Sequence, residues 1–141
     1  MDELSAALAY SQLQRVGENH KRLGDVANAY RTSFEKIPAI ILPPTHPHHA
    51  WHLFVIAVPT GIRDQFRINL KSKGIGTQIH YRPLHRQPYI EEVSAESKQQ
   101  EFPHADLFYK SAVSIPMFAG LTDNGVKQVI ISVKSVINDL G

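Results

Sequence analysis

The chain has 141 residues, of which 43% are hydrophobic and 20% are charged, a composition typical of one folded domain and not of a disordered chain. Fifteen Lys and Arg against thirteen Asp and Glu give a net charge of +2, and the basic residues are scattered, so nucleic acid is not expected as a partner. The absence of Cys excludes disulfides, thiolate metal sites and Cys nucleophiles.

The sequence carries no sign of a membrane segment or a signal peptide. No apolar stretch approaches the roughly 20 residues that span a bilayer. Asp2 and Glu3 place acid where a signal peptide carries base. We therefore expect a soluble, cytoplasmic protein without a membrane partner.

Residues 2–36 contain no Pro and are predicted to be helical, since most apolar residues there recur at steps of three or four. Pro38 marks the end of this segment. A continuous helix over residues 3–36 would be about 50 Å long, whereas a domain of this size has a diameter of only about 37 Å. The helix is therefore expected either to break near Gly17 or to pack its first half on something that this chain lacks.

A Pro- and His-rich loop over residues 38–50 leads into the central elements. Trp51 to Val58 is apolar at both alternating positions, which predicts a buried strand. A helix is predicted over residues 62–70, with Thr60 as its cap and Gly74 in the left-handed conformation at its end.

The rest of the chain continues this alternation. Gly76 to Arg82 alternates apolar and polar residues, which predicts a strand with one polar face. Residues 86–101 are polar and are predicted to form a surface loop. Pro103 opens a predicted helix, a short strand over residues 113–118 follows, and Thr122 caps the last helix. The predicted inward-facing residues are Ala105, Phe108, Tyr109 and Ala112 in the first of these helices, and Val126, Val129, Ile130, Val133 and Ile137 in the second.

This order of elements predicts an α/β (α+β) fold. We expect a small, roughly three-stranded sheet with packed helices, preceded by a long N-terminal helix.

The first candidate site is the His-rich loop. His46, His48 and His49, with His52 nearby, are spaced closely enough to bind Zn²⁺ or Ni²⁺. However, a Pro-rich loop does not hold ligands rigidly, and the cluster contains no carboxylate. The competing interpretation is a solvated loop with His52 packed in the strand, and no metal ligand is assigned.

The second candidate site lies at the end of the strand predicted over residues 76–82, because strand ends and the loops after them often carry binding residues. His80 and Tyr81 can hydrogen-bond a sugar, Arg82 can pair with a phosphate, and His85 follows shortly after. The competing interpretation is a strand whose polar face simply meets water. The glycines of this segment do not form a dinucleotide-binding or phosphate-binding pattern.

The sequence shows no motif for nucleophilic, paired-carboxylate or Schiff-base catalysis. No G-x-S-x-G elbow accompanies the Ser, His and Asp residues, and Glu91 and Glu92 are interpreted as solvated carboxylates. Schiff-base chemistry needs a desolvated or tuned Lys, whereas the Lys residues here fall on polar helix faces or in a polar loop. They are Lys21, Lys36, Lys71, Lys73, Lys98, Lys110, Lys127 and Lys134. No catalytic residue is assigned.

The segment from Lys71 to Pro88, KSKGIGTQIHYRPLHRQP, resembles the motif KxxGIGTxxHYxPLHxQP of the DegT/StrS-type sugar aminotransferases. Flanking pieces agree with this family in the same order. They read MDELSAA at the start, then QL, HAWHLF, FPHA, SIPM and GLTD. The chain therefore resembles the C-terminal domain of these fold-type I enzymes over almost its whole length.

The resemblance implies a transamination that depends on pyridoxal phosphate. Glutamate would supply the amino group, and a nucleotide-linked keto sugar would accept it. The resemblance also implies that His80 and Tyr81 approach the substrate, with His85 in a supporting role. Arg82 stands where the family often has a smaller or apolar residue.

The resemblance further implies that the family's large domain, with its Schiff-base lysine, lies upstream of this sequence. Residues 1–37 would then form the connecting helix and residues 38–141 the C-terminal small domain, which alone is expected to bind no cofactor and to be inactive. The alternative is a stand-alone, non-catalytic module that binds a nucleotide sugar or a protein partner. An unaccompanied first helix would expose Leu4 and Leu8, which favours a homo-oligomer.

Overall fold

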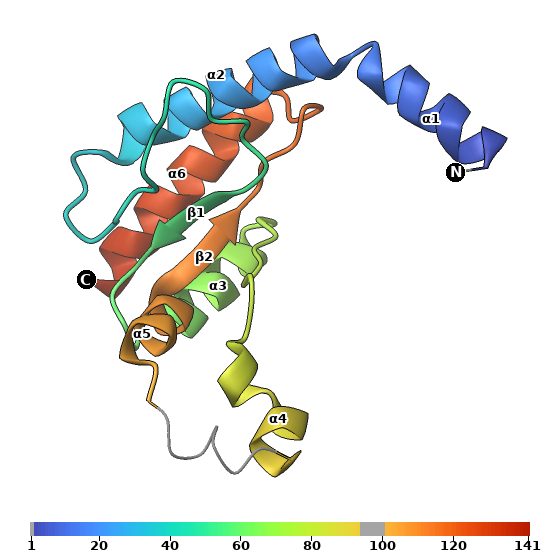
Figure 1. Ribbon diagram of the computed structural model, residues 1–141. Helices are drawn as coiled ribbons and strands as arrows, with labels where there is room; N and C mark the ends of the chain where they lie inside the picture. Colours follow the sequence, from blue (N-terminus) through green and yellow to red (C-terminus); the bar gives the residue numbers. More distant parts are fainter. Residues whose placement is uncertain (1, 94–100) are drawn as a thin grey trace.

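The computed structural model describes residues 2–93 and 101–141, which combine helices with a small antiparallel sheet (Figure 1). Helix α1 (Glu3–Leu13), capped by Asp2, projects away from the rest of the molecule and contains no buried residue. Helix α2 (Val16–Phe34) follows after a break at Gln14 and Arg15, close to the break expected near Gly17. The N-terminal segment is therefore two helices, and only the second joins the core.

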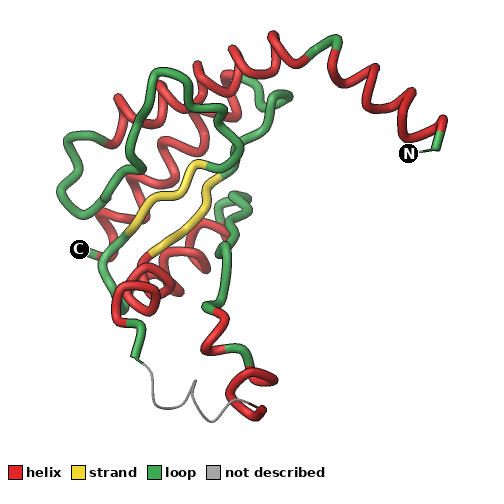
Figure 2. The backbone as a smooth tube through the Cα atoms, in the orientation of Figure 1, coloured by secondary structure: helices red, strands yellow, loops and turns green. Residues whose placement is uncertain are grey.

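The sheet has two strands, β1 (Phe54–Ala57) and β2 (Ala112–Ile115), which pair antiparallel in the centre of the fold (Figure 2). In this register Val55 lies opposite Ser114. All four residues of β2 are buried, and the strand ends directly before Pro116, which cannot donate a ladder hydrogen bond. Strand β1 lies inside its predicted segment, whereas β2 begins one residue before its own, at Ala112, so the assignment of Ala112 to the preceding helix is wrong.

The strand predicted over residues 76–82 does not form, so the sheet has two strands where roughly three were expected. Within this segment only Gln78 pairs with β2, through an isolated antiparallel bridge to Ser114. Gly76 carries no side chain that would pack on a pleated surface, and Pro83 lacks an N–H. The backbone of the segment therefore pairs with the sheet at Gln78 alone, and the rest of its course is set by side-chain contacts.

The core lies between the sheet and three helices: α2, α3 (Arg63–Ser72) and α6 (Asp123–Leu140). Helix α6 packs against both α2 and α3. Each large apolar side chain buried here stabilises the fold by about 1.5–3 kcal/mol. The largest fully buried side chains are Tyr30, Phe34, Phe54, Phe66, Ile56, Leu70, Val26, Val113, Val133 and Val136.

Helix α6 follows its sequence pattern closely. Thr122 caps it by accepting a hydrogen bond from the Gly125 N–H at 3.1 Å, as predicted. Of the predicted inward-facing residues, Ile130 is half-buried and the others are buried. Those buried residues are Val126, Val129, Val133 and Ile137.

Helix α3 is confirmed, but the prediction of its cap is wrong. The N-cap is Ile62, with no side-chain hydrogen bond, so Thr60 does not cap the helix. Because the helix starts two residues further along than a Thr60 cap requires, the hydroxyl lies outside its first turn. At the other end Gly74 has a φ of +78°, the left-handed conformation that was expected there.

The described residues of the segment before β2 form three short helices: η1 (Leu84–Arg86), α4 (Pro88–Val93) and α5 (Pro103–Ser111). The surface loop predicted over residues 86–101 is therefore wrong for α4, and its residues 94–100 lie outside the described part of the chain. Helix α5 forms as predicted but contains no buried residue, and Phe108 is half exposed. On its predicted apolar face, Tyr109 is half-buried beneath the Arg63 guanidinium of α3, and Ala105 and Phe108 are exposed. In the same described residues, no helix is both long enough and apolar enough to cross a bilayer.

Candidate functional site

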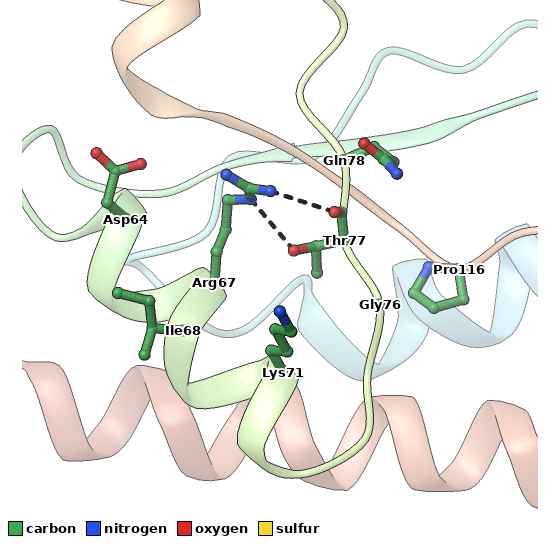
Figure 3. A pocket seen from close by; sticks show the side chains of 8 residues that line it. All are labelled: Asp64, Arg67, Ile68, Lys71, Gly76, Thr77, Gln78 and Pro116. Carbon is green, nitrogen blue, oxygen red and sulfur yellow. Dashed lines mark hydrogen bonds between the residues drawn. The ribbon is translucent and has the colours of Figure 1, made fainter.

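The candidate site is the segment of residues 76–87, which runs from the end of α3 through η1 to the start of α4. Its first part is held by α3 and β2. Arg67 of α3 donates from Nε to Thr77 Oγ1 at 3.3 Å and from Nη2 to the Thr77 carbonyl at 3.4 Å (Figure 3). The Gln78 and Ser114 backbones exchange hydrogen bonds of 3.1 and 2.8 Å. These contacts fix the entry to the segment.

The middle of the segment carries His80 and Tyr81, joined by a cis peptide bond. His80 is partly buried, and its Nδ1 lies 2.8 Å from the Ser114 hydroxyl. The Tyr81 ring meets the His80 ring edge-on, with 4.8 Å between centroids, and the Tyr81 residue is 76% exposed. The structure therefore brings these two predicted residues together, with the imidazole anchored and the phenol presented to the surface.

The end of the segment is held by Asp106 of α5. His85 Nε2 lies 2.9 Å from Asp106 Oδ1, and the Arg86 guanidinium donates to both carboxylate oxygens at 3.1 and 2.7 Å. The His85 ring also packs against Phe102, at 4.7 Å between centroids. Hydrogen bonds from Arg86 and then from His85 hold the pKa of Asp106 well below its usual range, although partial burial acts in the opposite direction.

The two histidines therefore have separate anchors. His80 is held by a hydroxyl of β2 and His85 by a carboxylate of α5, and within the described residues no contact joins His85 to His80 or Tyr81. Arg82 is exposed, and its carbonyl accepts a hydrogen bond from the Gln87 side chain at 3.1 Å.

Beside the start of this segment lies an open pocket of about 680 Å³ (Figure 3). Arg67 and Lys71 lie four residues apart on α3 and so share the face that lines it. Asp64 brings one carboxylate to the same pocket. The pocket thus offers both donors and an acceptor beside the apolar side chains of Ile68 and Pro116.

The sequence predicts His80, Tyr81 and His85 as site residues but does not predict Ser114 and Asp106, which hold the two histidines. The sequence assigns no role to either residue: Ser114 begins the string SIPM shared with the family, and Asp106 directly follows the string FPHA. The position of Ser114 within an apolar strand does indicate a bonded side chain, because a buried hydroxyl needs a hydrogen-bond partner. Asp106 lies on a polar helix position, where a solvated carboxylate is the ordinary expectation.

The His-rich loop is solvent-exposed. His46, His48 and His49 are all exposed, and the His48 N–H donates to His46 Nδ1 at 3.2 Å. His52, expected to pack in the strand, is instead exposed just before β1, so that expectation is wrong. Across the described residues, no three His, Asp or Glu side chains come together in a group that could hold a metal ion. Glu92 is exposed on α4, and the side chain of Glu91 lies outside the described part.

Comparison with known proteins confirms the resemblance. A profile of the DegT/DnrJ/EryC1/StrS aminotransferase family matches residues 1–134. The chain belongs to this family. The spore coat polysaccharide biosynthesis protein SpsC of Bacillus subtilis is 35% identical to it over 144 aligned positions, gaps included. The matched region covers 97% of this chain and 37% of SpsC. The chain thus spans little more than a third of the length of the curated relatives that it matches.

Solved structures of the family share the fold. PseC of Helicobacter pylori, an aminotransferase involved in the biosynthesis of pseudoaminic acid, matches with a TM-score of 0.90 and 22% identity, over 99% of this chain and 38% of PseC. The PLP-form of Spr1654 from Streptococcus pneumoniae matches with a TM-score of 0.90 and 22% identity, over 100% of this chain and 37% of that protein. The α/β fold expected from the sequence is therefore confirmed.

Members of the family depend on pyridoxal phosphate, and the residues described here do not by themselves fit that cofactor. A Schiff-base lysine must be desolvated or tuned by a neighbour. Every lysine in the described part of the chain is exposed, and Lys98 lies outside that part. Lys71 is the one that lines the pocket beside the candidate site, and it too is exposed. No chemical step through the cofactor is therefore assigned to these residues.

Proposed function

We propose that this chain is the C-terminal part of a cytoplasmic, pyridoxal-phosphate-dependent aminotransferase. The enzyme would transfer an amino group from glutamate to a nucleotide-linked keto sugar, in the biosynthesis of amino sugars or surface polysaccharides. The observation that carries the proposal is the family match over residues 1–134. The relationship to a polysaccharide biosynthesis protein of Bacillus subtilis supports the sugar substrate.

In this proposal, residues 76–87 form one wall of the sugar pocket. The Tyr81 hydroxyl and the His80 imidazole would hydrogen-bond the substrate, because Tyr81 is exposed and His80 is held firmly beside it. His85 would support the wall through its contact with Asp106. Residues 1–37 would connect this part to a large domain that supplies the lysine and the cofactor contacts, so the chain alone would not transaminate.

A chimera tests the proposal. The part of SpsC that matches this chain is replaced by this chain, and the product is supplied with pyridoxal phosphate, glutamate and a panel of nucleotide-linked keto sugars. We expect the chimera to form 2-oxoglutarate and an amino sugar, while this chain alone shows neither turnover nor the visible absorption of bound cofactor. His80→Gln and Tyr81→Phe in the chimera should each raise KM for the sugar by about tenfold, since each removes one hydrogen bond to the substrate.

Three outcomes count against parts of the proposal. If the chimera binds the cofactor and reacts with glutamate but accepts no keto sugar that SpsC accepts, this chain does not complete a sugar pocket. If the isolated chain then binds a nucleotide sugar in calorimetry, it is a non-catalytic binding module. Transamination by the chain alone would instead contradict the requirement for a large domain.

A further inference from the structure

Ser114 is a buried polar residue beside the candidate site. It is 5% exposed in the middle of β2, and its backbone is paired on both sides, with Val55 of β1 and with Gln78. A side chain on such a position has little freedom to move. Its hydroxyl is therefore a fixed point against which a neighbouring group can be oriented.

The hydroxyl of Ser114 faces the imidazole of His80. Within the described residues, His80 Nδ1, at 2.8 Å, is the one partner recorded for this oxygen. A hydroxyl carries a single hydrogen, and a buried donor without an acceptor costs about 1–3 kcal/mol. If Nδ1 carried a proton, the Ser114 hydrogen would have no acceptor. The arrangement in which the Ser114 hydrogen has an acceptor is the one where Ser114 donates to an unprotonated Nδ1. The proton of the neutral ring is then on Nε2.

We propose that Ser114 is a positioning residue that holds His80 in the tautomer with its proton on Nε2. The segment then offers an N–H donor to an oxygen of the ligand, whether a hydroxyl, a carbonyl or a phosphate oxygen of the nucleotide-linked sugar. This ligand assignment rests on the proposed function, whereas the tautomer and its cause do not.

His85 provides an internal comparison. Its Nε2 meets the Asp106 carboxylate, which accepts hydrogen bonds and cannot donate them when ionised. The Nε2 of His85 must therefore carry a proton, and its remaining ring nitrogen, Nδ1, is an acceptor when the ring is neutral. Although both neutral rings carry the proton on Nε2, His80 offers a donor to a ligand and His85 an acceptor. A change at Ser114 should affect only the first.

The tautomer is measured on the whole 141-residue chain, labelled with ¹⁵N, by long-range ¹H–¹⁵N correlation of the imidazole rings at about pH 8, above the ordinary titration range of His. The spectrum of His80→Gln identifies the His80 signals by their loss. We expect an unprotonated, hydrogen-bonded Nδ1 and a protonated Nε2. In Ser114→Ala the Nδ1 signal should move towards that of a nitrogen without a hydrogen bond. Ser114→Thr, which keeps the hydroxyl, should restore it, and the His85 signals should stay unchanged.

A proton on Nδ1 of His80 in the unaltered chain overturns the proposal, and this result needs no variant that might fold poorly. An unchanged Nδ1 signal in a folded Ser114→Ala chain overturns it as well.

The ligand part is tested in the SpsC chimera. There, Ser114→Ala should raise KM for the keto sugar by about tenfold while kcat at saturating sugar stays within about twofold, and Ser114→Thr should restore KM. An unchanged KM in an active chimera contradicts the assignment of the His80 N–H to the ligand. A chimera that accepts no keto sugar at all contradicts the proposed function instead, and leaves the NMR result to decide the tautomer.

Discussion

At the scale of single residues, the candidate site is held by side chains that belong to neighbouring elements. Arg67, Ser114 and Asp106 hold the segment of residues 76–87 at its start, middle and end. Each belongs to a different element, so the course of the segment is set by the packing of α3, β2 and α5. A segment anchored at three points can present an exposed Tyr81 in a constant position, although residues 79–83 around it form neither helix nor strand.

The contribution of Asp106 to the stability of the fold should depend on pH. Its pKa in the folded chain lies below the value of an unfolded carboxyl, so its ionised form stabilises the fold above about pH 4, and that stabilisation is lost as the pH falls. Asp106→Asn removes the charge that Arg86 and His85 share. We expect the variant to unfold at a lower urea concentration than the unaltered chain at pH 7, and the gap between the two midpoints to narrow at pH 3.

Asp25→Asn is the matched control, because Asp25 is exposed on α2 and its removal should leave the urea midpoint nearly unchanged at both pH values. A gap for Asp106→Asn that is as wide at pH 3 as at pH 7 would contradict the role of its ionised form.

The sequence singles out His80, Tyr81 and His85 as candidate ligand contacts, but it does not show what holds them. His80, Tyr81 and His85 follow from one contiguous motif. Their anchors lie far along the chain: Ser114 is 34 residues from His80, and Asp106 is 21 residues from His85. Such pairs depend on how the elements pack, and local spacing carries no information on that packing.

At the scale of elements, periodicity predicts that a helix exists more reliably than it predicts what covers it. Helix α6 buries almost all of its expected inward face, because that face packs on both α2 and α3. Helix α5 has an equally regular apolar face, yet contains no buried residue. The strand predicted over residues 76–82 does not form, for a related reason. Alternation of apolar and polar residues describes a side-chain pattern and does not supply a neighbouring strand to pair with. In the described residues, the Gln78 bridge is the single backbone pairing between this segment and β2.

The two threonines predicted as helix caps allow a matched test at this scale. Thr122 accepts the Gly125 N–H at the start of α6, whereas Thr60 makes no cap to α3. Thr122→Ala should therefore lower the free energy of unfolding by about 1 kcal/mol. Thr60→Ala should change it by less than about 0.5 kcal/mol. Urea unfolding of both variants checks this, and equal losses would contradict the assigned caps.

At the scale of the whole molecule, helices α1 and α5 both leave large apolar side chains exposed. Helix α1 leaves Leu4 85% exposed and Leu8 64% exposed, and α5 leaves Phe108 half exposed. Large exposed apolar patches mark surfaces that bind other chains or domains. The chain spans about 37% of SpsC. In a longer protein, parts outside this span could cover the surfaces that are exposed here.

Helix α1 supplies the sharpest consequence. It has 11 residues and none of them is buried, and isolated helices shorter than about 12–15 residues are marginal in water. In dilute solution we expect the amides of residues 3–13 to exchange hydrogen almost without protection, while those of α6 are protected. At high concentration, burial of Leu4 and Leu8 against a second copy would contribute about 1.5–3 kcal/mol for each leucine fully buried.

The chain should therefore associate as its concentration rises, with a mass in light scattering above the 15.8 kDa of the monomer and with new exchange protection in α1. The double variant Leu4→Glu, Leu8→Glu should stay monomeric, because it removes the apolar contact. Ser11→Glu, Gln12→Glu adds the same charge to the same exposed helix without removing an apolar side chain, and should associate like the unaltered chain. A monomeric mass at high concentration with α1 still unprotected would mean that a second copy does not cover this helix.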